Sequence, residues 1–304
     1  MSKNSLSWVL LLTLASIWGS SFILMKRGMF ALDGTPLFSD VQVAALRMSI
    51  AGTVLLPFSL YHVRKIVHWK QLLSLLIVGT CGNFFPAFLF TFAETKISSG
   101  FAGMLNSFTP VFALLIGFIV FKQRLTLVQF IGASIATFGI VLLMLAGKNA
   151  SIDASWWHIL AIVLATLLYG VSLNTIKHTL HQFKSMQITS LAFLCVYIPS
   201  VLVTIFSGSF TVIQNNPQAM EGLGFIAILS IIGTALALVI FNRLIALSST
   251  MFASSVTYFI PIVAVIIGTF FKERIGIYQI GAMFVVLIGV FVANYWHVLF
   301  GKKV

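Results

Sequence analysis

Charged side chains are scarce in this chain of 304 residues, and acidic side chains are the scarcest. Only 8% of the residues are charged, and six aspartates and glutamates stand against 18 lysines and arginines. Hydrophobic residues make up 60% of the sequence, a share that excludes an ordinary soluble domain of this size. The composition therefore predicts a protein that is embedded in a lipid bilayer.

Catalytic and metal-binding patterns are also missing. The sequence contains no GxSxG, HExxH or phosphate-loop motif, and its short expected connections leave no room for an added soluble enzyme domain. The two cysteines, Cys81 and Cys195, show no CxxC or cysteine–histidine spacing, so we interpret them as small buried hydrophobic residues. We accordingly expect no enzyme activity, no cofactor and no metal site.

Long apolar runs fill the rest of the sequence. A helix of about 20 apolar residues crosses the hydrocarbon core of a bilayer, and the runs are continuously apolar rather than alternating, which favours helices over a barrel. We interpret the first run as a retained span and not as a removable signal peptide. An all-α membrane protein with ten transmembrane helices is expected, at about residues 7–26, 41–61, 71–93, 99–121, 127–146, 156–177, 186–206, 222–247, 252–271 and 277–298.

The few charges are distributed unevenly between the expected connections. If the N-terminus is cytoplasmic, the inner connections hold most of the basic residues and no acidic residue, whereas all six carboxylates lie on the outer side. An excess of lysine and arginine marks the cytoplasmic side of a membrane protein. We therefore expect an N-in, C-in orientation, and we attribute the net charge of +12 to these connections rather than to binding of nucleic acid.

The sequence repeats itself once, with matching residues 151 positions apart along most of its length. Examples are Gly19 and Gly170, Ser21 and Ser172, Lys26 and Lys177, Gly82 and Gly233, and Pro110 and Pro261. We expect two copies of a five-helix unit, at residues 1–149 and 150–304. Because five is odd, the second copy enters the membrane from the opposite face, and such inverted repeats can exchange roles between inward-open and outward-open states.

Four strings carry a resemblance to a known family. They are SIWGSSFILMK in the first span, LRMSIAGTVLL in the second, NSFTPVFALLIGFIVFKQRLTLVQFIG across the fourth and fifth, and VTYFIPIVAVIIGTFFKERIGIYQIGA across the ninth and tenth. The chain resembles, over almost its whole length, the EamA-type family of the drug/metabolite transporter superfamily. The resemblance implies transport of small metabolites such as amino acids, their derivatives or nucleosides. One departure concerns the acid usual in both turns, which is Glu273 in the second copy but Gln123 in the first.

Candidate substrate-binding residues are polar or aromatic groups and prolines in the middle of the expected spans, above all where both copies carry one. Pro110 and Pro261 are equivalent and are predicted to kink spans four and nine; the kinks serve either packing alone or a cavity. Aromatic groups can pack against a substrate, and polar groups can bind it or a neighbouring helix. The predicted substrate-binding residues are Trp18, Ser21, Phe22, Asn83, Phe84, Asn106, Tyr169, Asn174 and Tyr258.

Two further charges lie within or near the spans. Arg47 lies about two turns inside the second span, and we interpret it as a structural arginine that reaches back toward the membrane surface, in preference to a ligand for a substrate carboxylate. Glu94, at the end of the third span, is a marginal candidate for carrying protons. Facilitated diffusion or exchange is therefore at least as well supported as proton antiport.

These observations together favour a carrier that moves small amphipathic metabolites by alternating access. Amino acids or related compounds are the favoured class, and the protein is expected to act as an exporter or facilitative carrier in the bacterial inner (plasma) membrane. The alternative is a non-transporting membrane scaffold or receptor built on the duplicated fold. The expected partners are a small-molecule metabolite and the lipid bilayer, without nucleic acid; self-association into a homo-oligomer through small residues such as Gly132 is left open.

Overall fold

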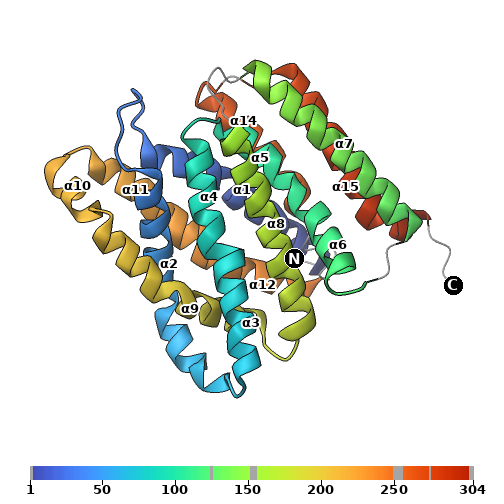
Figure 1. Cartoon of the computed structure of the whole chain (residues 1–304), viewed down its shortest axis with the longest axis horizontal. Coiled ribbons are helices and arrows are strands. Elements are labelled where there is room, and N and C mark those ends of the chain that lie inside the picture. Colours follow the sequence, from blue (N-terminus) through green and yellow to red (C-terminus); the bar gives the residue numbers. More distant parts are fainter. Residues whose placement is uncertain (1–2, 124–125, 151–155, 249–255, 274, 301–304) are drawn as a thin grey trace.

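The computed structural model describes residues 3–123, 126–150, 156–248, 256–273 and 275–300, whose regular structure is helical apart from one isolated bridge between Phe30 and Pro36 (Figure 1). The first half contains α1 (Lys3–Met29), α2 (Asp40–His62), η1 (Val63–Lys65), α3 (Trp69–Gly79), η2 (Thr80–Phe84), α4 (Phe85–Glu94), α5 (Ser99–Leu105), η3 (Asn106–Phe108), α6 (Thr109–Ile119) and α7 (Leu127–Ala150). The second half contains α8 (Trp156–Thr179), α9 (Ser185–Phe206), α10 (Ser209–Asn215), α11 (Ala219–Ser230), η4 (Ile231–Leu236), α12 (Ala237–Leu247), α14 (Val256–Phe270) and α15 (Ile277–Phe300).

Eight helical stretches of the described chain are long and apolar enough to cross a membrane. They correspond in order to the first eight expected spans. Two shorter apolar stretches, α14 (Val256–Phe270) and the Ile277–Ala293 part of α15, lie where the ninth and tenth are expected. Large hydrophobic side chains such as Ile198, Phe206 and Phe270 are exposed on the outside of the bundle, as a surface that faces lipid tails requires.

Three of the spans are interrupted in the middle. The third and eighth spans each contain a π-helical turn, η2 and η4, at equivalent places in the two halves. The fourth span is divided by the 3-10 turn η3, after which Pro110 occupies the first turn of α6, where a missing N–H breaks no helical hydrogen bond. The ninth span differs, because Pro261 lies inside the single helix α14.

The two halves contact each other reciprocally. Gly82 in η2 packs against Ser172 of α8, and a Cβ at Gly82 would overlap the Ser172 hydroxyl. The equivalent glycine, Gly233 in η4, packs against Ser21 of α1, where a Cβ would lie 3.1 Å from Ser21 Oγ. Each half thus supplies the same glycine and the same serine to the other, as in an interface formed about a two-fold axis.

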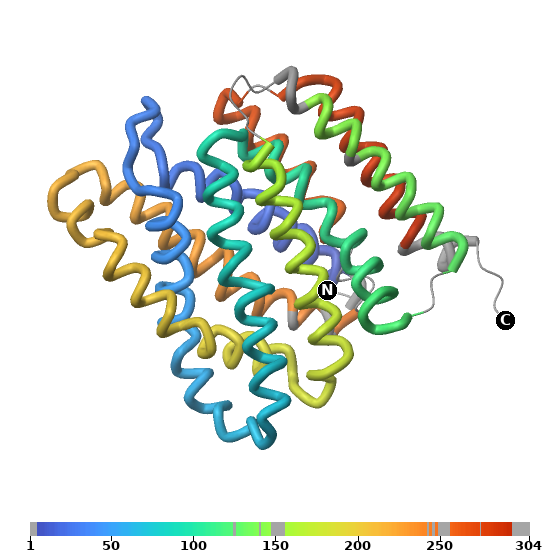
Figure 2. The backbone as a smooth tube through the Cα atoms, in the orientation of Figure 1, coloured from blue at the N-terminus to red at the C-terminus, as the bar shows by residue number. Residues whose placement is uncertain are grey.

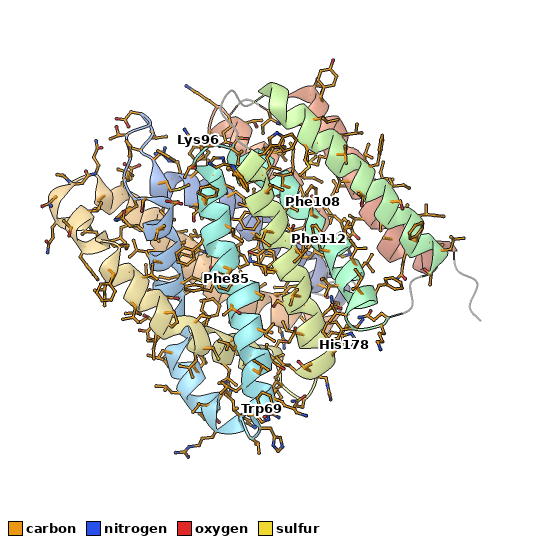
Figure 3. The ribbon with its side chains drawn as sticks, viewed as in Figure 1. Trp69, Phe85, Lys96, Phe108, Phe112 and His178 are labelled. Carbon is orange, nitrogen blue, oxygen red and sulfur yellow. The ribbon has the colours of Figure 1, made fainter. Side chains whose placement is uncertain are left out.

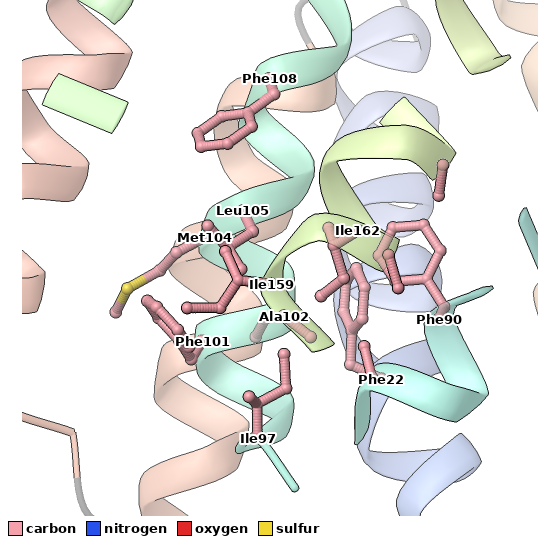
Figure 4. Packing of buried hydrophobic residues seen from close by; sticks show 14 of the residues in the cluster. Phe22, Phe90, Ile97, Phe101, Ala102, Met104, Leu105, Phe108, Ile159 and Ile162 are labelled. Atoms are coloured by element: carbon pink, nitrogen blue, oxygen red, sulfur yellow. The ribbon is translucent and has the colours of Figure 1, made fainter. Parts of the chain in front are cut away.

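The bundle has its main buried cluster between α1, α4, α5 and α8. Phe22, Phe90, Phe101 and Phe108 are all at most 6% exposed and pack there among aliphatic side chains (Figure 4). Lipid tails are as apolar as these side chains, so close packing rather than escape from water stabilises this part of the bundle. The cluster borders the polar groups described below.

Helices α7 and α15 lie side by side along one edge of the molecule (Figure 2). Their backbones meet at glycine: a Cβ at Gly289 would overlap the backbone nitrogen of Ala136 and lie 2.7 Å from the carbonyl oxygen of Gly132. A Cβ at Gly281, two turns earlier on α15, would meet nothing within 4 Å. Contact between these helices therefore depends on Gly289 and not on Gly281.

Gly289→Val is expected to destabilise the purified protein by about 1–3 kcal/mol, because the added side chain must force α7 and α15 apart. The measurement is the thermal unfolding midpoint in detergent. Gly281→Val makes the same chemical change on the same helix and should leave the midpoint near that of the unaltered protein. Equal shifts in the two variants would show that helix propensity, and not the close contact, explains the effect.

Candidate functional site

Arg47 is a charged side chain directed into the bundle. Its Nε donates a hydrogen bond to Thr234 Oγ1 at 3.3 Å, and its Nη1 lies 3.5 Å from the sulfur of Met25. Thr234 belongs to η4 in the second half and Met25 to α1, so the guanidinium reaches across the bundle. The interpretation of Arg47 as an arginine that reaches back to the membrane surface is therefore not supported, and the residue becomes a candidate for the site.

A chain of three aromatic side chains from three helices begins near this arginine. Tyr169 of α8 lies within electrostatic range of Arg47 and stacks on Phe90 of α4, with 6.1 Å between ring centroids. Phe90 in turn contacts Phe22 of α1, at 5.8 Å between centroids. Two of these, Phe22 and Tyr169, are among the predicted substrate-binding residues, and the structure brings them together through Phe90.

Glu94 lies one turn beyond Phe90 at the end of α4. Its side chain is completely buried, and neither carboxylate oxygen has a hydrogen-bond partner among the residues that the structure describes. It lies within electrostatic range of Lys26, Arg47 and Glu273. We refer to Phe22, Arg47, Phe90, Glu94 and Tyr169 as the Arg47 cluster.

The π-turn η4 presents two consecutive residues to the first half. The carbonyl oxygen of Gly233 accepts a hydrogen bond from Trp18 Nε1 at 3.2 Å, and Thr234 accepts the hydrogen bond from Arg47. Thr234 donates its own hydroxyl proton to the carbonyl of Leu229, five residues earlier, at 3.2 Å. Such π-turns are frequent at functional sites, because they redirect side chains and backbone groups within a helix.

At one end of the bundle, Glu273 joins the two halves. Its carboxylate accepts hydrogen bonds from the backbone N–H and hydroxyl of Ser99 and from the N–H of Gly100, at 2.9 to 3.0 Å, and it pairs with Lys26 at 3.4 Å. Ser99 and Gly100 form the first turn of α5, where a carboxylate is favoured by the free N–H groups and the helix dipole. Lys26 also donates to the carbonyl of Ile97 at 3.1 Å.

At the opposite end, Gln123 takes the equivalent place. Both Gln123 and Glu273 follow a lysine with a left-handed backbone, Lys122 at φ 52° and Lys272 at φ 59°. Gln123 Nε2 donates to Asn174 Oδ1 at 3.1 Å, and its Oε1 accepts from Lys177 at 3.4 Å. The departure seen in the sequence therefore replaces an ion pair with amide hydrogen bonds. Figure 3 labels Lys96 near the Glu273 end and His178, which also contacts Gln123, near the other.

The remaining predicted site residues make their contacts elsewhere. Asn174 is buried at the Gln123 end, where its amide donates to the carbonyls of Ala113 and Gly170 at 2.8 and 2.9 Å. Ser21 packs against Gly233 and donates to Ile17 of its own helix. Each of the others contacts a neighbour outside the Arg47 cluster: Asn83 bonds Val78, Phe84 packs on Phe85 and Phe88, Asn106 accepts from Thr109, and Tyr258 bonds Val290.

Arg47, Glu94 and Thr234 are the polar residues at the site that the sequence-based selection did not include. The sequence did point to Arg47 and Glu94, because a charge within an apolar run is unusual. Neither charge recurs in the second copy, however, where the equivalent positions are Ile198 and Ile245. Among the described residues, no group of three or more histidine, cysteine or acidic side chains could hold a metal ion.

A bundle of apolar helices built from two reciprocal halves, with charged and aromatic groups between them, defines a multi-pass membrane protein of the transporter class. The model of the EamA-like transporter family matches residues 6–145 and again residues 156–295. The chain belongs to this family, and the resemblance noted in its sequence is confirmed.

Similar proteins carry transporter names. An "Uncharacterized transporter" of Archaeoglobus fulgidus is 24% identical over 94% of this chain and 97% of its own length. A "Probable terminal-alkyne amino-acid exporter" of Streptantibioticus cattleyicolor is 23% identical over 88% of this chain and 86% of its own length. The "Uncharacterized inner membrane transporter YedA" of Escherichia coli is 23% identical over 85% of this chain and 80% of its own length.

The overall architecture is shared with a solved structure. The match with one crystal structure covers 99% of this chain and 100% of the chain in that structure. Its TM-score of 0.63 at 15% sequence identity shows a common fold. The family, the apolar helices and the inner-membrane relative confirm the expected localisation, a multi-pass protein of the bacterial inner membrane. Its environment is lipid, and the class of its cargo is small molecules.

Proposed function

We propose that this protein moves small amphipathic metabolites, with amino acids or related compounds as the favoured class, and acts as an exporter or facilitative carrier. The observation that carries the proposal is Arg47, a guanidinium held between the two halves near Tyr169, which in turn stacks on Phe90. A guanidinium binds a carboxylate through two parallel hydrogen bonds, and aromatic rings accept an apolar side chain. The amino-acid exporter among the relatives supports the same class.

We further propose that transport proceeds by alternating access of ten helices in two inverted repeats, residues 1–149 and 150–304, with both termini inside. The reciprocal packing of Gly82 with Ser172 and of Gly233 with Ser21 supports a two-fold relation between the halves. The distribution of basic residues supports the orientation. In this orientation the Glu273 end is the outer end, and the Gln123 end is the inner end.

We place the proposed substrate site at the Arg47 cluster and η4. Arg47 would bind the carboxylate, while Trp18, Phe22 and Tyr169 would contact the apolar part of the substrate. Trp18 is half-buried, and its indole N–H donates a hydrogen bond to the carbonyl of Gly233. The position of its ring therefore depends on the second half of the protein. Asn174 and Ser21 would act through packing between helices, because their polar groups bond to helix backbone.

Counterflow in liposomes tests the proposal. Purified protein reconstituted into vesicles loaded with an unlabelled compound should accumulate the labelled form of the same compound, for at least one neutral amino acid in a panel of amino acids and nucleosides. Uptake should saturate with concentration, since a carrier binds its substrate at a limited number of sites. Vesicles without protein provide the control.

The outcomes separate the classes of function. Absence of counterflow for every compound in the panel would reject the amino-acid carrier and favour the scaffold or receptor reading. Counterflow of nucleosides alone would keep the carrier and reject the proposed class. Trp18→Ala should slow counterflow of an accepted amino acid. The function of a non-transporting scaffold would not change with this substitution.

A further inference from the structure

Glu94 belongs to the Arg47 cluster but makes no contact with the substrate as proposed, although it is the most enclosed carboxylate in the described chain. Its side chain has 0% exposure, and both of its oxygens lack a hydrogen-bond partner in that part of the chain. An ionised carboxylate in an apolar interior is stable only when it is paired and hydrogen-bonded. The arrangement seen here therefore suits the neutral, protonated acid.

Charged and titratable groups surround this part of α4. Lys26 on α1 and Arg47 on α2 lie within electrostatic range of the carboxylate. From α8, Tyr169 stacks on Phe90 and His158 stacks on Phe92, the latter at 4.6 Å between ring centroids. Glu273 approaches from the turn before α15 and binds the first turn of α5. The two cations nearest to Glu94 already have partners, because Arg47 bonds Thr234 and Lys26 pairs with Glu273.

The partners of Lys26 come from different halves of the protein. Lys26 and Glu94 both belong to the first half, on α1 and α4, which are in contact. Glu273 belongs to the second half and reaches Lys26 at 3.4 Å only because the two halves meet at this end. An opening of the outer end that separates Glu273 from Ser99, Gly100 and Lys26 would leave Lys26 without its counter-ion. Glu94, on the adjacent α4, is then the carboxylate of the first half that can take the place of Glu273.

We propose that Glu94 is a proton-binding site, and that Lys26 exchanges Glu273 for Glu94 as its partner when the outer end opens. This inference rests on the proposed alternating access and orientation. In the closed outer end, Glu94 carries its proton and Lys26 pairs with Glu273. On opening, the O–H bond of the Glu94 carboxyl breaks, the proton passes to the outer solution, and the carboxylate left behind pairs with Lys26.

The direction of the pH effect follows from this exchange. Because opening releases a proton, a high proton concentration favours the closed outer end and a low concentration favours the open one. Substrate binding that favours either state would therefore change how tightly Glu94 holds its proton, which couples the movement of substrate to that of protons.

A distance measurement that needs no substrate tests the proposal. Spin labels at Lys96→Cys and Tyr278→Cys, both exposed near the outer end, would be placed in a Cys81→Ala, Cys195→Ala background in lipid nanodiscs. Pulsed electron spin resonance would record the distance between them from about pH 5 to about pH 9. The population with the longer distance should rise with pH. Glu94→Gln, which stays neutral, should keep the shorter distance throughout, and Glu94→Asp should restore a pH response.

Glu221→Gln is the matched control, because Glu221 forms the other ion pair at this end, with Arg27 at 3.4 Å, but is half exposed. It should retain the pH response of the unaltered chain. A distance independent of pH in the unaltered chain, or a full pH response in Glu94→Gln, would overturn the proposal. A pH response without any counterflow would instead reject the transport function and leave the proton site standing.

Discussion

Arg47→Lys should reduce counterflow of an accepted amino acid by about tenfold to a hundredfold, which corresponds to the loss of one charge-assisted hydrogen bond or more. Lysine keeps the positive charge, but it cannot offer two parallel N–H groups to a carboxylate while it also bonds Thr234. The initial rate of counterflow at several substrate concentrations is the measurement. A raised half-saturation concentration with little change in the maximal rate would indicate that substrate binding itself is weakened.

The control for this change is Arg243→Lys, which makes the same substitution at an exposed position of α12 and should leave counterflow unaffected. Thermal stability must be measured for both variants, because Arg47 also ties α2 to η4. If Arg47→Lys lowered the unfolding midpoint and left counterflow of the folded protein intact, Arg47 would have a packing role alone. The carboxylate-binding role would then be rejected.

Glu273→Gln should shift the outer end strongly toward its open state, by about tenfold or more in population. Each oxygen of the Glu273 carboxylate accepts from the first turn of α5, Oε1 from the N–H of Ser99 and Oε2 from Gly100 and the Ser99 hydroxyl. In glutamine one of these oxygens becomes an NH2 group, which faces donors and binds none of them. The ion pair with Lys26 is lost at the same time.

The same pair of spin labels at positions 96 and 278 measures this effect. The longer distance should dominate in Glu273→Gln at a pH where the unaltered chain shows the shorter one. Glu221→Gln removes the negative charge from the neighbouring ion pair of equal length and should cause no such shift. A short distance in Glu273→Gln would mean that packing of α5 against α14, and not the carboxylate, holds this end closed.

Much of the fold could be predicted because lipid imposes simple rules on a chain. A span needs about 20 apolar residues, and the eight stretches that are long and apolar enough to cross a membrane follow the first eight expected spans. Kinks were predicted at both Pro110 and Pro261. The 3-10 turn η3 lies directly before α6 and Pro110, whereas α14 continues through Pro261. The π-turns were not predicted, because their sequences, with Gly82 and Gly233, look like those of ordinary close helix contacts.

The candidate site was harder to predict from the sequence than the fold was. Selection of positions that are polar, aromatic or kinked in both copies included Trp18 and Tyr169, but it passed over Arg47 and Glu94, which occur once. It also included Asn174, whose amide is occupied by the backbone of α6 and α8. Which helix a polar side chain faces depends on how the halves pack, and periodicity within one copy does not contain that information.

The reciprocal glycine–serine contacts also bear on how this chain can change over evolutionary time. A larger residue at Gly82 would overlap the Ser172 hydroxyl, and one at Gly233 would crowd the Ser21 hydroxyl, so the residue tolerated in one copy depends on the residue in the other. The two copies thus constrain each other at their contacts. Arg47 and Glu94 have no charged counterpart in the second copy, where Ile198 and Ile245 stand, so the contacts shared by the two copies do not by themselves specify these two charges.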